Sequence, residues 1–231
     1  MTPAAIFFDL DGTLCQPRRR FAEVFAAASA PLCRAYPVVD QVTLLAAWGR
    51  ALAAPGPSTT AMALTQALTE CATAPVDALR IADCAAMLNH TWAAAQQLAP
   101  AARETLHVLG EHYPLGLITN GPADAQRAVI AALELTPHFR WIVVSGDAEV
   151  GVRKPDAAIF HHALALADVQ AQAAWYVGDS LINDIGGAAG AGLRTCWLAP
   201  DDAPLAADAP QPHARIRRLS ELRAILLVHP R

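Results

Sequence analysis

Short apolar runs that end in polar residues or glycine recur along the chain. The first run, Ala4–Phe8, is followed at once by Asp-Leu-Asp-Gly-Thr. Later runs of the same kind cover residues 115–118, 141–144, 174–177 and 195–198. A wholly apolar run of this length is typical of a parallel strand that is buried on both faces of its sheet. The pattern therefore predicts a set of buried parallel strands, each ending in a polar turn.

Helix-forming stretches lie between the later runs, at residues 122–133, 155–167 and 181–191. Pro122 and Pro155 stand at first-turn positions of the first two stretches, and Ser180 is a suitable N-cap for the third. Strands that alternate with helices indicate an α/β fold with a doubly wound parallel sheet. Ligands bind to such sheets at the carboxyl ends of the strands. The polar residues that follow each strand are therefore the candidates for chemistry.

Residues 16–98 interrupt the alternation. They are rich in helix formers and are divided by prolines, which predicts helices near 18–35, 38–54, 58–72 and 76–97. We expect an all-helical domain at 16–98, inserted into an α/β core domain formed by 1–15 and 99–231. The loop at 199–213 is rich in Asp, Ala and Pro and is expected to be exposed.

The composition fits a globular protein. Hydrophobic residues make up 54% of the chain and charged residues 16%, so the chain can bury a core. The net charge is −4, and the one basic run, Arg18–Arg20, is expected to lie in solvent at a helix start, so nothing indicates nucleic-acid binding. We find neither a signal-peptide pattern nor an apolar run near the ~20 residues of a membrane span. We expect a soluble cytoplasmic protein.

The cysteines do not form a recognisable framework. Their number, five, is odd, and no two of them form a CxxC pair. A disulfide scaffold or a zinc knuckle is therefore not predicted, and reduced thiols in a cytosol fit better.

Two carboxylates follow the first predicted strand. Asp9 and Asp11 can converge on one point if the chain turns sharply, which Gly12 permits. Close carboxylates repel each other, so they attract a cation or share a proton. Such a pair can divide the roles of nucleophile and acid if the surroundings separate their pKa values. The bland alternative is an Asp-rich turn.

The later strands end in further polar residues. Thr119 and Asn120 follow the run at 115–118, and a threonine hydroxyl there can either cap a helix or bind a phosphoryl oxygen. Lys154 is the only lysine beside sixteen arginines. A chain that otherwise uses arginine and keeps one lysine suggests a place where a compact ammonium is needed. Asp179 and Asp184 follow the run at 174–177 and offer oxygen ligands that suit magnesium.

These segments together resemble the haloacid dehalogenase superfamily. FFDLDGTL, ITNG, GVRKPD and GDSLIND look like its four motifs and occur in the family order. The resemblance implies a nucleophile, Asp9, that forms an aspartyl-phosphate, and an acid–base residue, Asp11. It also implies that Thr119, Asn120 and Lys154 bind the phosphoryl group. At the Mg²⁺ site, Asp9, the backbone carbonyl of Asp11 and Asp179 would bind the ion directly, while Asp184 would hold a metal-bound water or orient the site.

The insertion resembles the helical C1 cap of that superfamily. Residues 16–98 contain no lysine, which argues against the phosphonate-cleaving relatives, and the presence of Asp11 argues against the dehalogenases themselves. The resemblance implies a phosphatase for a small phosphorylated metabolite, such as a nucleotide or a sugar phosphate. It is strongest to the branch with pyrimidine 5′-nucleotidases and N-acylneuraminate phosphatases. A sugar phosphomutase, or a silent binding protein on the same fold, remains an alternative.

The resemblance leaves the substrate contacts of the cap open. His90 and Trp92 could touch a substrate, but surface or cap-core positions are the expected reading. The oligomeric state is expected to be a monomer or a homodimer.

Overall fold

The computed structural model describes residues 2–56, 58–72, 74–199 and 205–227. Within them, a six-stranded sheet has the order β5–β4–β1–β6–β7–β8, and all neighbouring strands are parallel. The strands are β1 (Ala5–Phe8), β4 (Leu115–Thr119), β5 (Trp141–Val144), β6 (Ala174–Gly178), β7 (Arg194–Leu198) and β8 (Ala214–Ile216). The chain runs outward from β1 on both sides, which confirms the predicted doubly wound sheet. β8 was not predicted.

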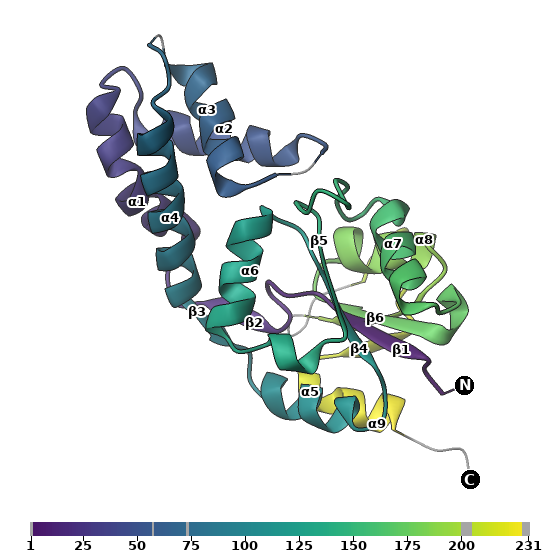
Figure 1. Ribbon diagram of the computed structural model, residues 1–231. Coiled ribbons are helices and arrows are strands. Elements are labelled where there is room, and N and C mark those ends of the chain that lie inside the picture. Colours follow the sequence, from purple (N-terminus) through teal and green to yellow (C-terminus); the bar gives the residue numbers. More distant parts are fainter. Residues whose placement is uncertain (1, 57, 73, 200–204, 228–231) are drawn as a thin grey trace.

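Alternate residues of β1 face opposite sides of the sheet, and both sides are covered by helices (Figure 1). Ile6 and Phe8 pack under α5 (Ala102–Gly110), α6 (Ala123–Ala132) and α9 (Leu222–Leu226). Ala5 and Phe7 pack under α7 (Ala157–Ala167) and α8 (Gly187–Gly190). A strand buried on both faces needs an unbroken apolar run, which is why the sequence pattern marks β1 clearly.

The inserted helices form a bundle with its own apolar core, drawn in purple to teal in Figure 1. They are α1 (Phe21–Ala35), α2 (Gln41–Ala53), α3 (Thr60–Cys71) and α4 (Ala78–Ala94). Each begins two or three residues later than predicted. Asp40, Thr59 and Asp77 are N-caps, because their side chains accept hydrogen bonds from backbone N–H groups of the first turn. An N-cap residue lies directly before the first residue of its helix, whereas the predicted ranges counted these N-caps as part of the helices.

A two-stranded antiparallel ribbon links the bundle to the sheet unit. It consists of β2 (Cys15–Pro17) and β3 (Gln96–Leu98), and it corrects the prediction of a helix through residue 97. Arg18 extends the ribbon, because its backbone N–H donates to Ala95 O and its side chain donates to Gln97, so the expected helix start there is wrong. Three-residue strands carry too little periodicity to be recognised in a sequence.

The predictions for the helical stretches 155–167 and 181–191 also need correction. α7 begins at residue 157 rather than 155, because the Asp156 side chain caps it by accepting from Ala158 N. The predicted helix 181–191 is a π-helix, Leu181–Gly186, followed by α8. Ser180 caps it as expected. Residues 205–213 of the loop at 199–213 are exposed or half-buried, whereas residues 200–204 lie outside the described residues. Among the helices that the structure describes, none has the length and apolar character for a membrane crossing.

One carboxylate of the sheet unit binds two helices of the bundle. Asp124, at the start of α6, accepts from the backbone N–H of Thr60 in α3 at 2.8 Å. Its other oxygen accepts from the Asn89 amide in α4, also at 2.8 Å. Thr60 is fully buried at this contact. Asp124 therefore ties α3 and α4 to α6.

We expect Asp124→Ala to destabilise the protein by about 1–3 kcal/mol, because the buried Thr60 and the half-buried Asn89 lose their acceptor. Urea unfolding followed by circular dichroism measures this change. Asp83→Ala, an exposed position in α4, is the control and should alter the free energy of unfolding by less than about 0.5 kcal/mol. Equal stability of both variants would contradict this role of Asp124.

Candidate active site

Lys154 lies at the centre of a buried polar cluster beneath the strand ends. Its Nζ is 2.5 Å from Asp9 Oδ1 and 2.7 Å from Asp184 Oδ1. It also donates to Tyr176 Oη at 2.8 Å and to the carbonyl of Ile118 at 3.1 Å. Only 3% of the Lys154 side chain is exposed. The lone lysine of the chain therefore joins the ends of β1, β4 and β6 around one ammonium group.

The electrostatics of this cluster keep Lys154 charged. Burial alone would lower the pKa of Lys154, but the carboxylates of Asp9 and Asp184 outweigh it, so the pKa is raised. Burial raises the pKa of Tyr176 well above its ordinary value, and Asp184 raises it further. Tyr176 is thus a neutral hydroxyl that positions the ammonium and the carboxylate beside it.

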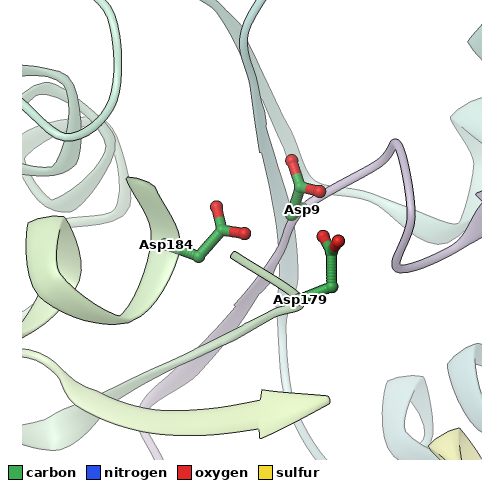
Figure 2. Close-up of side chains that lie close together, drawn as sticks. All are labelled: Asp9, Asp179 and Asp184. Atoms are coloured by element: carbon green, nitrogen blue, oxygen red, sulfur yellow. The ribbon is translucent and has the colours of Figure 1, made fainter. Parts of the chain in front are cut away.

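Three carboxylates converge above the lysine. Asp9, Asp179 and Asp184 each offer an oxygen, and these oxygens lie within 4.8 Å of one another. Figure 2 shows the three side chains directed toward a common space from the end of β1, the turn after β6 and the π-helix. Burial raises the pKa of Asp9, despite the opposing charge of Lys154, and also that of Asp179. Three carboxylates, two of them buried and that of Asp179 half-buried, converge beside one ammonium, so an oxygen-seeking divalent cation fits this donor set.

Two glycines let these acidic turns approach each other. Gly12 has a φ of +84°, and a Cβ there would lie 2.5 Å from Asp179 Oδ2. A Cβ on Gly178 would lie 2.5 Å from the Cβ of Asp184. Any side chain at either position would push a carboxylate out of the cluster.

Asp11 lies beside these three carboxylates but has different partners. Its Oδ2 accepts a hydrogen bond from Gln126 Nε2 at 2.9 Å. Burial raises the pKa of Asp11, and the bond from Gln126 opposes that change. Asp9 has Lys154 within contact distance, whereas Asp11 has a neutral amide. The two carboxylates therefore differ in their surroundings, which is the condition for a division of roles between them.

Thr119 and Asn120 occupy different roles at the end of β4. The Thr119 hydroxyl is buried and has no hydrogen-bond partner among the described residues. The Asn120 side chain instead makes two bonds of 2.9 Å to the backbone of Lys154, one to the N–H and one to the carbonyl. Thr119 thus has a hydroxyl ready for a ligand, while the amide of Asn120 holds the lysine in place.

All the predicted site residues border one cavity. Its volume is about 190 Å³, and it is lined by Asp9, Asp11, Thr119, Asn120, Lys154, Asp179, Ser180, Asn183 and Asp184. The carboxyl ends of β1, β4 and β6 meet at this edge of the sheet, so residues far apart in sequence are brought together.

Three residues that hydrogen-bond to the predicted site residues were not predicted from the sequence. Tyr176 bonds both Lys154 and Asp184, and Gln126 bonds Asp11. The hydroxyl of Thr13 donates to Asp179 Oδ1 at 3.2 Å. Tyr176 and Thr13 could have been recognised in the sequence, because a tyrosine stands in an otherwise apolar strand and a threonine follows Asp-Gly. Gln126 could not have been recognised, because a glutamine in a predicted helix is common.

The fold and the site together define an α/β protein that gathers carboxylates and a lysine at the strand ends, a setting for phosphoryl groups and a hard cation. The chain belongs to the haloacid dehalogenase-like hydrolase family, whose model matches residues 3–192.

Curated relatives with phosphatase names are similar to parts of the chain. The glyceraldehyde 3-phosphate phosphatase of Pyrococcus abyssi is 43% identical over 100 residues, which cover 43% of this chain and 41% of that protein. The N-acylneuraminate-9-phosphatase of Mus musculus is 34% identical over 130 residues, or 56% of this chain and 52% of that protein. The matches thus span about half the length of these relatives. The second confirms the predicted likeness to that branch.

Solved structures are similar over nearly the whole chain. The 2-haloacid dehalogenase from Pseudomonas syringae pv. Tomato superposes with a TM-score of 0.75 at 28% identity, covering 98% of this chain and 99% of that one. The magnesium-bound HAD-hydrolase YfnB from Bacillus subtilis gives a TM-score of 0.66 at 24% identity, covering 99% and 100%. The second likeness shows the fold alone. Both extend over the helical bundle as well as the sheet unit.

Proposed function

We propose that the protein is a Mg²⁺-dependent phosphomonoester hydrolase that acts on a small phosphorylated metabolite through an aspartyl-phosphate on Asp9. One observation carries this proposal. Lys154 is buried between Asp9 and Asp184, and Thr119, whose hydroxyl has no partner within the described residues, lines the same cavity. An ammonium and a hydroxyl beside a carboxylate suit a phosphoryl group that Asp9 attacks.

In the first step of the proposed reaction, each site residue has its own role. Asp9 attacks phosphorus, and Lys154 and Thr119 donate to the phosphoryl oxygens as charge develops on them. Asp9, Asp179, Asp184 and the backbone carbonyl of Asp11 would hold Mg²⁺, which neutralises phosphoryl charge when bound. Asn120 acts on the backbone of Lys154 and is a positioning residue in this proposal.

Asp11 acts as the general acid in the first step and as the general base in the second. Its raised pKa, due to burial, keeps a proton available for the leaving oxygen in the first step. The deprotonated Asp11 then takes a proton from the water that cleaves the aspartyl-phosphate, and free Asp9 returns. Gln126 orients the Asp11 carboxyl through its bond to Oδ2.

The helical bundle, residues 16–98, is in this proposal the cap domain that covers the site and selects substrates. The core domain then comprises 1–15 and 99–231. The bundle contacts the sheet unit through Asp124, so a bound substrate would be held between the two units.

The test is the turnover of p-nitrophenyl phosphate by purified protein with and without Mg²⁺. We expect coloured product and an equal amount of inorganic phosphate with Mg²⁺, and neither after chelation. Absence of turnover with any divalent metal would favour a silent binding protein. A sugar phosphomutase would release little inorganic phosphate from its proper sugar phosphate, which a panel of phosphorylated metabolites would expose.

Mg²⁺ affinity should rise with pH. Burial raises the pKa of Asp9 to about 8 in the metal-free protein and raises that of Asp179. Protons occupy these carboxylates at low pH and must leave when the cation binds. Affinity should therefore increase from pH 6 toward pH 8 and level off above it, with proton release near neutral pH. Titration calorimetry in two buffers of different ionisation enthalpy measures both, and an affinity independent of pH would contradict the account.

A further inference from the structure

A second cavity lies between the helical bundle and the sheet unit. Its volume is about 230 Å³, and it borders Asn120 and Gln126, which also contact the active-site residues. Its apolar walls are Phe21, Trp48, Leu52, Leu88 and Trp92. An engineered apolar cavity of about 150 Å³ holds a benzene molecule, so this one has room for a substituted ring. Its place beside the active site suits the alcohol part of a phosphomonoester.

The aromatic walls are fixed by contacts with one another. Phe21 and Trp92 meet edge to face, with ring centroids 5.1 Å apart, and Trp48 packs against Phe25 at 5.7 Å. Trp92 packs against the core of the helical bundle, which is one of the two expected positions, and it also lines the cavity. Rigid aromatic walls favour a flat apolar group. Sugar hydroxyls placed against them would lose their hydrogen bonds to water.

Arg153 adds a positive charge to this cavity. It lines the cavity immediately before Lys154 in sequence and is half-buried. In the part of the chain that the structure describes, its guanidinium has no carboxylate or hydrogen-bond partner. Burial lowers the pKa of Arg153, although a guanidinium stays protonated. A half-buried cation without a counter-ion is stabilised by an anion that enters beside it.

We infer that this cavity selects phosphomonoesters whose alcohol part is flat and apolar and carries a carboxylate, with Arg153 as the specificity-determining residue. The aromatic walls hold the ring, and the guanidinium donates to the carboxylate. This inference rests on the proposed function, because it needs the phosphoryl group in the neighbouring cavity.

A pair of substrates isolates the charge. 4-Carboxyphenyl phosphate and 4-carbamoylphenyl phosphate have nearly the same shape, but only the first carries an anion on the ring. We expect the wild-type protein with Mg²⁺ to have a kcat/KM about tenfold or more higher for the carboxylate, as a charge-assisted hydrogen bond implies. The preference should appear in KM more than in kcat, because the contact is present before the reaction and during it.

Variants of Arg153 test the assignment. Arg153→Gln should bring the ratio of the two kcat/KM values close to one, and Arg153→Lys should keep part of the preference, because it retains the charge without the planar fork. Arg80→Gln is the control, since Arg80 lies on the exposed side of α4 in an ion pair with Asp77, and it should keep the wild-type ratio.

Each outcome decides the matter. Turnover of both esters with equal kcat/KM overturns the inference and leaves the proposed function intact. No turnover of either ester, nor of p-nitrophenyl phosphate, overturns the proposed function and this inference with it. A preference that survives in Arg153→Gln removes Arg153 as its source. If that variant folds poorly, the wild-type ratio and the Arg153→Lys ratio still decide.

Discussion

Asp9→Asn is expected to reduce phosphate release by about 10⁴-fold or more, because the proposed aspartyl-phosphate needs a carboxylate at this position. The amide keeps the size of the carboxylate but is not a nucleophile at neutral pH. Steady-state release of inorganic phosphate from p-nitrophenyl phosphate measures the loss. Asp156→Asn is the matched control, because it removes a carboxylate from the motif of Lys154 while asparagine still caps α7.

The fold of Asp9→Asn should remain intact. Burial raises the pKa of Asp9, so its ionised form is costly in the metal-free protein above that pKa, and a neutral amide avoids this cost. Lys154 keeps Asp184 as a counter-ion. We therefore expect a thermal midpoint within about 4 °C of the wild type, a shift that corresponds to less than about 1–2 kcal/mol. Full activity in a folded Asp9→Asn protein would remove Asp9 as the nucleophile.

Lys154→Met should damage both activity and stability. Activity should fall by about 10³-fold or more, since the cation that stabilises the phosphoryl oxygens is lost. Stability should fall by about 3–5 kcal/mol in the metal-free protein, because the buried carboxyl groups of Asp9 and Asp184 lose the ammonium that pairs with them. Chemical denaturation of the metal-free protein measures this second effect.

The stability loss of Lys154→Met should depend on pH. Without the ammonium, the pKa of the buried Asp9 carboxyl rises above the value of about 8 that it has beside Lys154. Below that value Asp9 is protonated in both folded proteins, and above it the variant carries an additional penalty that the wild type avoids. The loss should therefore be smaller at pH 6 than at pH 9. A loss that is equal at both values would contradict the ion pairing.

Two further variants separate charge from shape at this position. Lys154→Arg should be about as inactive as Lys154→Met. Four groups surround Nζ closely and leave no space for a planar guanidinium. Tyr176→Phe is the milder control, since it removes one of the four contacts and keeps the ring that packs against Phe160. Wild-type rates in Lys154→Arg would show that any cation suffices there.

The sheet and the predicted site residues could be read from the sequence because their signals are local. β1 is an apolar run that ends in Asp9 and Asp11, and the order of strands and helices defines where strand ends meet. Lys154 stood out because the chain contains no other lysine. Its contacts with Asp9 and Asp184 then follow from the topology, which brings the strand ends together.

The remaining features depend on contacts that no local pattern encodes. Gln126 and Asp124 lie on the same turn of α6, yet one binds Asp11 and the other binds Thr60 and Asn89. Trp92 has the sequence context of a core residue and nevertheless lines a cavity, because the bundle packs against the sheet unit at that point. Tertiary packing decides such roles, so they required the structure.

The most direct test of the central claim is mass spectrometry of the protein quenched in acid during turnover of p-nitrophenyl phosphate with Mg²⁺. We expect one added phosphoryl group on the peptide that contains Asp9, removable by hydroxylamine and absent from the Asp9→Asn protein. A phosphoryl group on another residue would contradict the account. So would sustained turnover in which no phosphorylated peptide forms under any quench time.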